Sequence, residues 1–458
     1  MIYEMIQEPV ATLHRMPSDS EVIIASEDDG TGARHKVVMP SGVSARTLFK
    51  KPKWFHRFPF LMICVITLGL ALLFIILLAT SAETWFSSNG NVKHFEDGEF
   101  YIEHTAEDVE YHRKMVDEVN AKNTSWKAAY NRFASRAASM FDGDAAFTTQ
   151  LLFMKRSAIH GNKSTFEELV GDTVGHTQKL AQLPKTNIPK HFDARETWPY
   201  CESIHKVENQ GGCGSCYAVV TTSVIADRIC IATNGTKQPS ISTQDLISCC
   251  PDCGGCHGTI WALFSFNYWR DHGIVTGGSY GSGDGCKPYA QPPNCGSPCS
   301  TSVYSGNDHK DMTCRRKCHP LYEKLYNEDL NRAKSVYWVK ANRGTTGEFK
   351  ELKAMLTATD ESSEIILKQE LMKYGPMLAC FVVYEEFQHY KTGIYVSETS
   401  SSTKELYGHC AKLIGWGEDE NGTKYWSYMN TWGRAWGEHG FFKMAGEPEE
   451  AAGGIPLL

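Results

Sequence analysis

The distribution of cysteine is the feature that most restricts how this chain can fold. The 458 residues include 16 cysteines, of which thirteen lie between Cys201 and Cys318 and only Cys64 lies before residue 200. This density is typical of a disulfide framework formed in an oxidising compartment. Zinc knuckles are the alternative, but the cysteines lack the repeated pairing that zinc fingers show. We therefore predict a compact, cross-linked domain in this part of the chain.

An uncharged segment at residues 58–80 is long enough to span a bilayer once. Basic residues precede it and acidic residues follow it, so the positive-inside rule places the N-terminus in the cytosol. The Asn-x-Ser/Thr glycosylation sequons all follow it, at Asn123, Asn162, Asn234 and Asn421. We therefore expect a transmembrane signal-anchor helix at 58–82 and a type II topology. Cleavage after Ala82, which would release a soluble protein, is the alternative.

Composition divides the chain into four segments. Residues 1–57 mix charges with Ser, Gly and Pro and are predicted to be a disordered cytosolic tail, followed by the anchor at 58–82. Residues 83–187 are rich in charge and poor in cysteine, and residues 188–458 form the cysteine-rich domain. Within 110–134 the apolar spacing predicts one or two short amphipathic helices, and the chain from there to about residue 189 is predicted to be an extended connector. The net charge of −7 argues against a nucleic-acid partner, which would select a basic face.

The stretch NQGGCGSCYA at 209–218 is the first candidate for chemistry. Apolar residues recur at helical spacing after it, as far as a plausible stop at Gly235, so Cys216 is expected in the first turn of a helix. Further along, residues rich in Val, Ile and aromatics predict strands at 335–340, 377–384, 410–416 and 425–429. An Asn-Gly turn signal between the last two predicts a hairpin centred near residue 420. Such a hairpin brings His409 opposite Asn430, give or take a couple of residues.

A cysteine nucleophile acts as its thiolate, which an unperturbed thiol rarely forms at neutral pH. A helix N-terminus and a neighbouring imidazolium together can lower a thiol pKa by about five units. Cys216 is expected to have the first of these, and His409 is placed to supply the second. Asn430 would orient the imidazole, and Gln210 would donate to the developing oxyanion beside the Cys216 N–H. We therefore predict nucleophilic catalysis by these four residues.

Other chemistries fit parts of the same region. Cys213 and Cys216 could form a redox pair, but no βαβ context surrounds them and the expected compartment is oxidising. Cys253-Gly-Gly-Cys256-His257 fits the attachment pattern of c-type haem, which is a weak signal in a chain so rich in cysteine. The glycine run at 277–285 is similar to a dinucleotide loop, but no strand leads into it, which favours a flexible loop.

These residues resemble the papain family of cysteine proteases. The stretch 210–218 is similar to the family's nucleophile motif, YGHCAKLIGWG at 407–417 to its histidine motif, and YWSYMNTWGRAWGEHGFF at 425–442 to its asparagine motif. The resemblance implies an α+β, two-lobed papain-like fold. It has a helical left lobe, a β-barrel-like right lobe and the catalytic cleft between them, here preceded by a propeptide and one transmembrane helix. It also implies that Trp432 shields the hydrogen bond between Asn430 and His409.

Within that family the sequence looks most similar to the cathepsin B branch. The branch's disulfides imply the pairs Cys201–Cys230, Cys213–Cys256, Cys249–Cys314, Cys250–Cys253, Cys286–Cys318 and Cys295–Cys299. Under this pairing Cys216 is the free thiol, and Cys64, Cys380 and Cys410 are left over. Residues 115–134 are similar to the branch's pro-segment, which implies that residues from about 83 to 187 are an inhibitory propeptide that is removed on activation.

Three departures from cathepsin B concern substrate binding. Only three residues separate Cys295 from Cys299, so the paired histidines of the occluding loop are missing, and we expect mainly endopeptidase rather than dipeptidyl carboxypeptidase activity. Gly258 is followed by Thr259 where the family usually has a second glycine that pairs with substrate. A loose match places Glu450 at the base of the second specificity pocket. The extra sequence at 341–361 has no counterpart in the comparison.

We therefore expect a membrane-tethered cysteine protease proenzyme, lumenal (endolysosomal) or extracellular, whose partners are polypeptide substrates and its own propeptide. No metal or organic cofactor is implied. A catalytically silent papain-fold binding protein is the alternative, favoured by Thr259 and the short loop. A third hypothesis, a single-pass receptor or adhesion protein, is supported only by the membrane span and the sequons.

Overall fold

The computed structural model describes residues 92–94, 100–102, 105–122, 124–131, 134, 163–259, 261–293, 311–341, 362–397 and 405–458. The chain divides into two compact units, Met1–Trp85 and Phe86–Leu458, and every described residue belongs to the second. The predicted tail at 1–57 and the predicted span at 58–82 lie outside the described residues. Among the residues that are described, no helix has the length and apolar character needed to cross a membrane.

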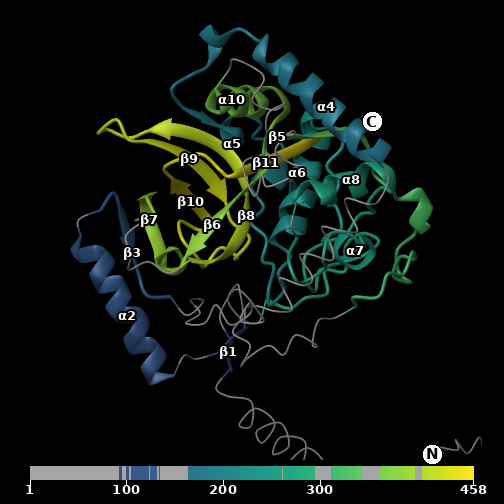
Figure 1. The fold of residues 1–458 in the computed structure, drawn as a ribbon. Coiled ribbons are helices and arrows are strands. Elements are labelled where there is room, and N and C mark those ends of the chain that lie inside the picture. Colours follow the sequence, from purple (N-terminus) through teal and green to yellow (C-terminus); the bar gives the residue numbers. More distant parts are fainter. Residues whose placement is uncertain are drawn as a thin grey trace, which may run out of the picture. The chain divides into compact units, whose positions relative to one another are not determined.

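The described part of the chain contains both helices and strands (Figure 1). The α-helices are α2 (Ala106–Ala121), α4 (Lys163–Ala181), α5 (Ala194–Thr197), α6 (Cys216–Ala232), α7 (Thr243–Cys249), α8 (Leu263–Asp271) and α10 (Ser363–Tyr374). Short 3-10 helices are η4 (Lys185–Asn187), η5 (Glu202–Ile204), η6 (Tyr326–Glu328) and η7 (Glu385–His389). The strands are β1 (Val92–His94), β2 (Phe100–Ile102), β3 (Trp126–Ala128), β4 (Phe192–Asp193), β5 (Ala333–Ala341), β6 (Met377–Tyr384), β7 (Tyr390–Tyr395), β8 (Glu405–Glu418), β9 (Lys424–Met429), β10 (Phe441–Met444) and β11 (Glu450–Pro456).

Most strands belong to one nine-stranded sheet, in the order β3-β7-β10-β9-β8-β6-β11-β5, with β4 paired to β8. Strands β8 and β9 form the predicted hairpin, with Glu418 opposite Lys424. Strands β6 and β8 are also antiparallel and place Phe381 opposite His409. The four strands expected from composition are therefore confirmed, because long buried runs of β-branched and aromatic residues are stable only in a sheet that is covered on both faces.

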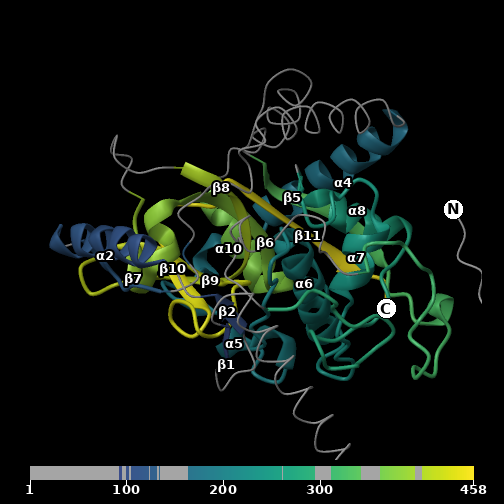
Figure 2. The same cartoon turned by 90° about the horizontal axis from the view of Figure 1, so that it is seen from below.

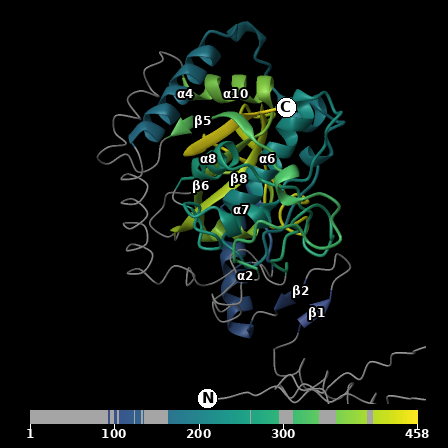
Figure 3. The ribbon, with the colours of Figure 1, turned by 90° about the vertical axis from the view of Figure 1, so that its right-hand side faces the viewer.

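Two apolar cores support an α+β fold. One lies among α6, α7 and α8 and includes Val220, Leu246 and Phe266. The other lies between the sheet and α10 and includes Phe381 and Leu413. Figure 1 shows helices α6 to α8 gathered on one side and most strands on the other, and in Figure 3, seen from the helical side, these helices overlap the strands. This arrangement agrees with the helical lobe and the sheet lobe expected from the sequence.

The region before residue 188 differs from the expectation at two places. Helix α2 ends at Ala121 and Trp126 lies in strand β3, which pairs with β7, so the predicted helical pattern over 110–134 is only partly correct. The predicted extended connector contains helix α4. Its buried positions include Thr173, His176 and Thr177, polar residues that interrupt the apolar spacing of Phe166, Leu169, Val170 and Val174. Figure 2 shows α2 beside β7, whereas α4 lies with α10 and β5.

Candidate active site

Cys216 is the first residue of α6 and the free cysteine among the described residues. The loop before it is fixed by the Cys213–Cys256 disulfide and by a 2.8 Å hydrogen bond from Gly214 N to Cys256 O. Gly214 has no room for a side chain, because a Cβ there would lie 2.6 Å from the Cys256 carbonyl oxygen. The helix continues to Ala232, and Gly235 has the positive φ expected of a stop. The predicted position of the thiol at a helix N-terminus is confirmed.

His409 is buried on β8 and contacts Asn430, as the hairpin geometry predicted. Its Nε2 lies 2.8 Å from Asn430 Oδ1. Since an amide oxygen only accepts, Nε2 carries the hydrogen and Nδ1 is the lone-pair nitrogen of the neutral ring. Asn430 is held in turn by a 2.8 Å hydrogen bond from its backbone N to Gly440 O. The Trp432 ring centroid lies 4.7 Å from that of His409, so this buried indole covers the histidine.

The strand that carries His409 also contacts the thiol. The Cys410 backbone hydrogen-bonds Cys216, and helix α6 packs against β8. The structure therefore places the Cys216 thiol against Cys410, the residue next to His409. Cys216 and His409 lie almost two hundred positions apart in the sequence.

The pKa shifts of both groups oppose the formation of an ion pair in this state. Burial raises the pKa of the Cys216 thiol to about 11, and the backbone hydrogen bonds from Cys410 and Tyr217 only partly oppose that rise. Burial also lowers the pKa of His409 to about 4, against the opposing effect of its bond to Asn430. The expectation of a lowered thiol pKa is wrong for this state, because desolvation outweighs the helix N-terminus.

Gln210 is buried beside the nucleophile loop. Its Nε2 donates to Cys213 O at 2.8 Å, and its Oε1 accepts a 2.6 Å bond from Thr431 Oγ1. Its backbone N donates to Thr431 O at 2.9 Å. Thr431, the residue after Asn430, therefore holds Gln210 in place. This contact joins the nucleophile motif to the asparagine motif. The role of Thr431 was not found from the sequence, because it depends on a contact between distant loops.

The observed disulfides decide between the alternatives left open for the Cys213–Cys216 and Cys253–Cys256 pairs. Five of the six implied pairs are present, namely Cys201–Cys230, Cys213–Cys256, Cys249–Cys314, Cys250–Cys253 and Cys286–Cys318. Residues 295 and 299 lie outside the described residues. Since Cys213 is bonded to Cys256 and Cys253 to Cys250, neither a Cys213–Cys216 redox pair nor a thioether-linked haem is available.

A disulfide that the sequence analysis did not predict joins Cys380 and Cys410. The two residues are direct partners in the β6–β8 ladder, which places their Cα atoms 4.0 Å apart. Both strands were predicted from the sequence, but the register in which they pair was not. Without that register, the sequence did not indicate that Cys380 and Cys410 lie opposite each other. The bond fixes β8 at the residue after His409.

Comparison with known proteins identifies the family that this geometry indicates. The sequence model described as papain family cysteine protease matches residues 188–454. The chain belongs to the papain family of cysteine proteases. That match contains Cys216, His409 and Asn430 and begins where the cysteine-rich domain was predicted to begin.

Relatives within the papain family carry cathepsin B-like names. The chain is 36% identical over 333 residues to cathepsin B-like cysteine proteinase 3 of Caenorhabditis elegans, covering 72% of this chain and 77% of the relative. It is 36% identical to cathepsin B-like cysteine proteinase 1 of Haemonchus contortus, covering 65% of this chain and 80% of that one. Among solved structures, proCathepsin B S9 from Trypanosoma congolense matches with a TM-score of 0.49 and 26% identity, covering 76% of this chain and 98% of that chain.

The predicted substrate-binding residues of this papain-family chain lie in different surroundings. Gly258 and Thr259 follow His257, whose backbone bridges to Gly214 beside the nucleophile, and Thr259 Oγ1 donates to Trp261 O at 3.1 Å. Glu450 is buried on β11 and accepts a 2.9 Å bond from Trp338 Nε1. Its carboxylate is therefore engaged inside the fold, whereas the Gly258–Thr259 loop adjoins the nucleophile.

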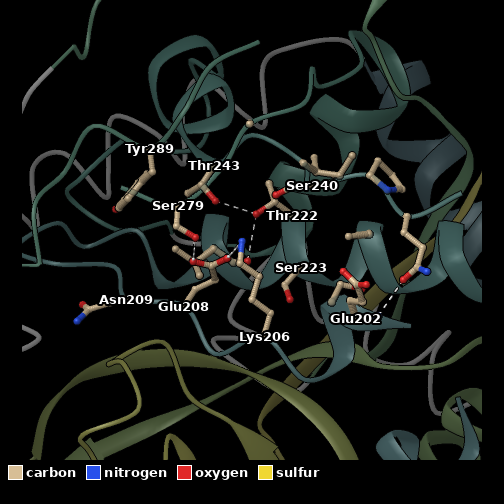
Figure 4. A pocket seen from close by; sticks show the side chains of 18 residues that line it. Glu202, Lys206, Glu208, Asn209, Thr222, Ser223, Ser240, Thr243, Ser279 and Tyr289 are labelled. Carbon is tan, nitrogen blue, oxygen red and sulfur yellow. Dashed lines mark hydrogen bonds and ion pairs between the residues drawn. The ribbon is translucent and has the colours of Figure 1, made fainter. Parts of the chain in front are cut away.

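A cavity of about 230 Å³ lies beside helix α6 (Figure 4). Thr222 and Ser223 of the helix line it, together with Ser279 and Tyr289 from loops. None of the described residues that line it is Cys216, His409 or Asn430, so this cavity is not the catalytic cleft. The Tyr289 hydroxyl donates to Gln210 O at 2.8 Å, which connects the cavity wall to the nucleophile loop.

Proposed function

We propose that the chain is the proenzyme of a cathepsin B-like cysteine endopeptidase that uses Cys216, His409, Asn430 and Gln210. The observation that carries this proposal is the free thiol at the start of α6, held against the strand whose His409 is oriented by Asn430 at 2.8 Å. Membership of the papain family supports a cysteine protease as such.

The proposed reaction follows from the polarity of these groups. His409 Nδ1 takes the proton of Cys216, and the thiolate attacks the carbonyl carbon of the scissile peptide bond. The Cys216 N–H and the second Nε2 hydrogen of Gln210 donate to the oxyanion. The imidazolium then gives its proton to the leaving amine, and water hydrolyses the thioester to restore the thiol. Asn430 keeps the ring in the required tautomer throughout.

Latency of the proenzyme is supported by two features. The raised pKa of the Cys216 thiol and the lowered pKa of His409 both disfavour the ion pair that catalysis needs. The region before residue 135 is docked on the sheet, because β3 adds to β7 as an extra antiparallel strand and Tyr111 of α2 donates to Glu385 Oε1 at 3.0 Å. Strand addition of this kind is held by backbone hydrogen bonds and is therefore reversible once the segment is cut.

Hydrolysis of an internally quenched peptide tests both the activity and its type. The matured protein is expected to cut the peptide internally, because the loop between Cys295 and Cys299 has no paired histidines to bind a terminal carboxylate. The Cys216→Ala variant, matured in trans by an added protease, is expected to lose at least about 10⁴-fold in kcat/KM. Mass spectrometry of the products distinguishes internal cuts from stepwise loss of C-terminal dipeptides.

Two results would count against this proposal. Stepwise release of dipeptides would contradict the endopeptidase assignment, although the catalytic residues would stand. A matured protein that hydrolyses nothing and leaves Cys216 unlabelled by a thiol-directed epoxide would favour a silent papain-fold binding protein.

We also propose that residues 58–82 anchor the proenzyme as a type II membrane protein, with the catalytic domain in the lumen or outside the cell. The support is the uncharged segment at 58–80 with basic residues before it. Asn234 and Asn421, the two sequons within the described residues, are exposed in turns. The full chain is expected to stay in the membrane pellet after alkaline carbonate extraction and to shift in mass with glycosidase. Complete release by carbonate would contradict the anchor.

A further inference from the structure

We propose that Tyr289 is a positioning residue for the proposed peptide hydrolysis, because its hydroxyl holds the nucleophile loop at both Gln210 and Ser215. The inference rests on the proposed function, since it concerns the groups that act around Cys216. Tyr289 lines the cavity beside α6 (Figure 4) and lies outside the nucleophile, histidine and asparagine motifs.

The ring of Tyr289 is held in place by packing and by the backbone of its loop. The side chain is 6% exposed and belongs to the apolar core among α6, α7 and α8. The backbone N of Tyr289 donates to Gly278 O at 2.9 Å, and that of Ala290 donates to Gln244 Oε1 at 3.0 Å. Substitution by phenylalanine would therefore keep the packing of the ring and remove only the hydroxyl.

The Tyr289 hydroxyl connects two residues of the nucleophile loop. It donates to Gln210 O at 2.8 Å and lies 2.7 Å from Ser215 Oγ. A carbonyl oxygen only accepts, so the single hydroxyl hydrogen of Tyr289 goes to Gln210, and Ser215 Oγ donates to Tyr289. Each bond of such a chain polarises the next and so strengthens it. All three residues are more than nine-tenths buried, so bulk water does not compete for these bonds.

At Gln210 the Tyr289 hydroxyl completes a set of contacts that orients the side-chain amide. Thr431 binds the backbone N and the Oε1 of Gln210, and Cys213 O accepts a bond from its Nε2. Tyr289 binds the backbone carbonyl oxygen. In the proposed mechanism the other Nε2 hydrogen donates to the oxyanion, which requires an accurately placed amide. Tyr289 therefore acts on the oxyanion through Gln210.

At Ser215 the Tyr289 hydroxyl prevents a competing hydrogen bond. A serine just before a helix is usually extended, and its side chain accepts from the second or third helical N–H. Ser215 instead has φ −102° and ψ 17°, and within the described part of the chain its side chain caps no helical N–H. The N–H of Tyr217, the second residue of α6, is bonded to the Cys216 thiol. Tyr289 thus keeps the Ser215 hydroxyl from taking that donor away from the thiol.

Steady-state hydrolysis of the quenched peptide by matured variants tests the inference. Tyr289→Phe is expected to lower kcat about tenfold to a hundredfold and to change KM less than about threefold, because the oxyanion donors act in the transition state. Tyr326→Phe is the matched control, since it also removes a hydroxyl that donates to a buried group, Asp245, at 3.0 Å. Its kcat should change less than about twofold. A Tyr289→Phe variant whose kcat falls no further than that of Tyr326→Phe would overturn the inference.

The pH profile of kcat/KM separates positioning from a mere loss of stability. Release of the Ser215 hydroxyl in Tyr289→Phe is expected to weaken the bond from Tyr217 N–H to the thiolate. The acid limb of the profile should then move to higher pH by about one unit. The double variant Tyr289→Phe with Ser215→Ala has no hydroxyl to compete for this N–H, so its acid limb should match that of the unaltered enzyme while the loss in kcat remains. An acid limb that stays shifted in the double variant, or never moves in Tyr289→Phe, would contradict the inference.

Failure of this inference can be told apart from failure of the proposed function. An unaltered enzyme that hydrolyses the peptide no faster than Tyr289→Phe overturns the inference alone. If the unaltered protein hydrolyses nothing, the pH profile of Cys216 labelling by the epoxide replaces that of kcat/KM, with the same expected shift of about one pH unit. If Tyr289→Phe does not fold, Ser215→Ala replaces it and is expected to lower kcat about threefold to tenfold, because Tyr289 loses the donor that orders its hydroxyl. An unchanged kcat in that variant would overturn the inference.

Discussion

Alkylation of Cys216 in the intact chain is expected to become about tenfold faster with each unit of pH, or about a thousandfold faster from pH 6 to pH 9. Burial raises the pKa of this thiol to about 11, so across that range the thiolate is a small fraction that grows tenfold per unit. The His409 pKa, lowered by burial to about 4, leaves the ring neutral throughout, so no adjacent cation flattens the profile. Iodoacetamide labelling, quenched at intervals and quantified on the peptide that contains Cys216, measures the rate.

The matured enzyme is expected to behave differently. Catalysis of this type needs a thiolate, and catalytic cysteines paired with histidine have pKa values of about 3–4. Labelling should then vary by less than about threefold over the same range. Cys216→Ser provides the background at each pH. An intact chain that is labelled as fast at pH 6 as at pH 9 would show that the ion pair already exists before maturation.

Replacement of Arg228 by Met is expected to lower the free energy of unfolding by about 3–5 kcal/mol. Arg228 is buried in α6 and pairs with Glu370 at 2.8 Å, while also donating to the carbonyl oxygens of Pro376 and Gly454 at 3.0 Å. Its removal leaves the buried carboxylate of Glu370 without its guanidinium partner. Urea unfolding followed by circular dichroism, with the disulfides intact, measures the change.

The contribution of Glu370 to the free energy of unfolding should be present at neutral pH and lost at strongly acidic pH. Its pKa is lowered to about 2 although burial alone would raise it, because His176 and Arg228 stabilise the carboxylate. A carboxyl with a depressed folded-state pKa contributes stability above its ordinary pKa of 4.5 and loses it as the pH falls through about 2. The gap between Glu370→Gln and the unaltered chain should thus persist at pH 5 and shrink near pH 2.

A surface ion pair provides the control for the buried one. Lys114 and Glu118 form an exposed pair on α2 at 4.0 Å, and Lys114→Met is expected to change stability by less than about 0.5 kcal/mol. An Arg228→Met variant that is destabilised no more than this control would contradict the importance of the buried pair. The double variant Arg228→Met with Glu370→Gln should lose less than the sum of the single changes, because it removes both partners.

The proposed catalytic residues were accessible to sequence reasoning because each lies in a short local pattern. A helix that begins at Cys216 follows from the spacing of the apolar residues after it. The turn signal near residue 420 folds a hairpin whose arms carry His409 and Asn430, and the register of β8 and β9 agrees with that estimate to within a few residues. The strands were found for the same reason, since alternation and composition act over neighbouring residues.

Helix α4 was missed although apolar residues recur at helical spacing over 166–180, because polar residues at three buried positions interrupt that pattern. Thr173, His176 and Thr177 are buried by hydrogen bonding and stacking, and such partners come from β5 and α10, far away in the sequence. The Cys380–Cys410 disulfide was missed for a related reason, because it depends on the register between β6 and β8. The register between two strands leaves no local periodic signal.

From the sequence alone, motif order and spacing indicated the family and the four proposed catalytic residues, and the resemblance to that family implied the five disulfides described here. Tertiary structure decided the direction of the pKa shifts of Cys216 and His409 and the docking of α4 on Glu370. The physical reason is that desolvation and buried hydrogen bonding depend on every group packed around a side chain. Those neighbours are assembled from the whole fold rather than from adjacent residues.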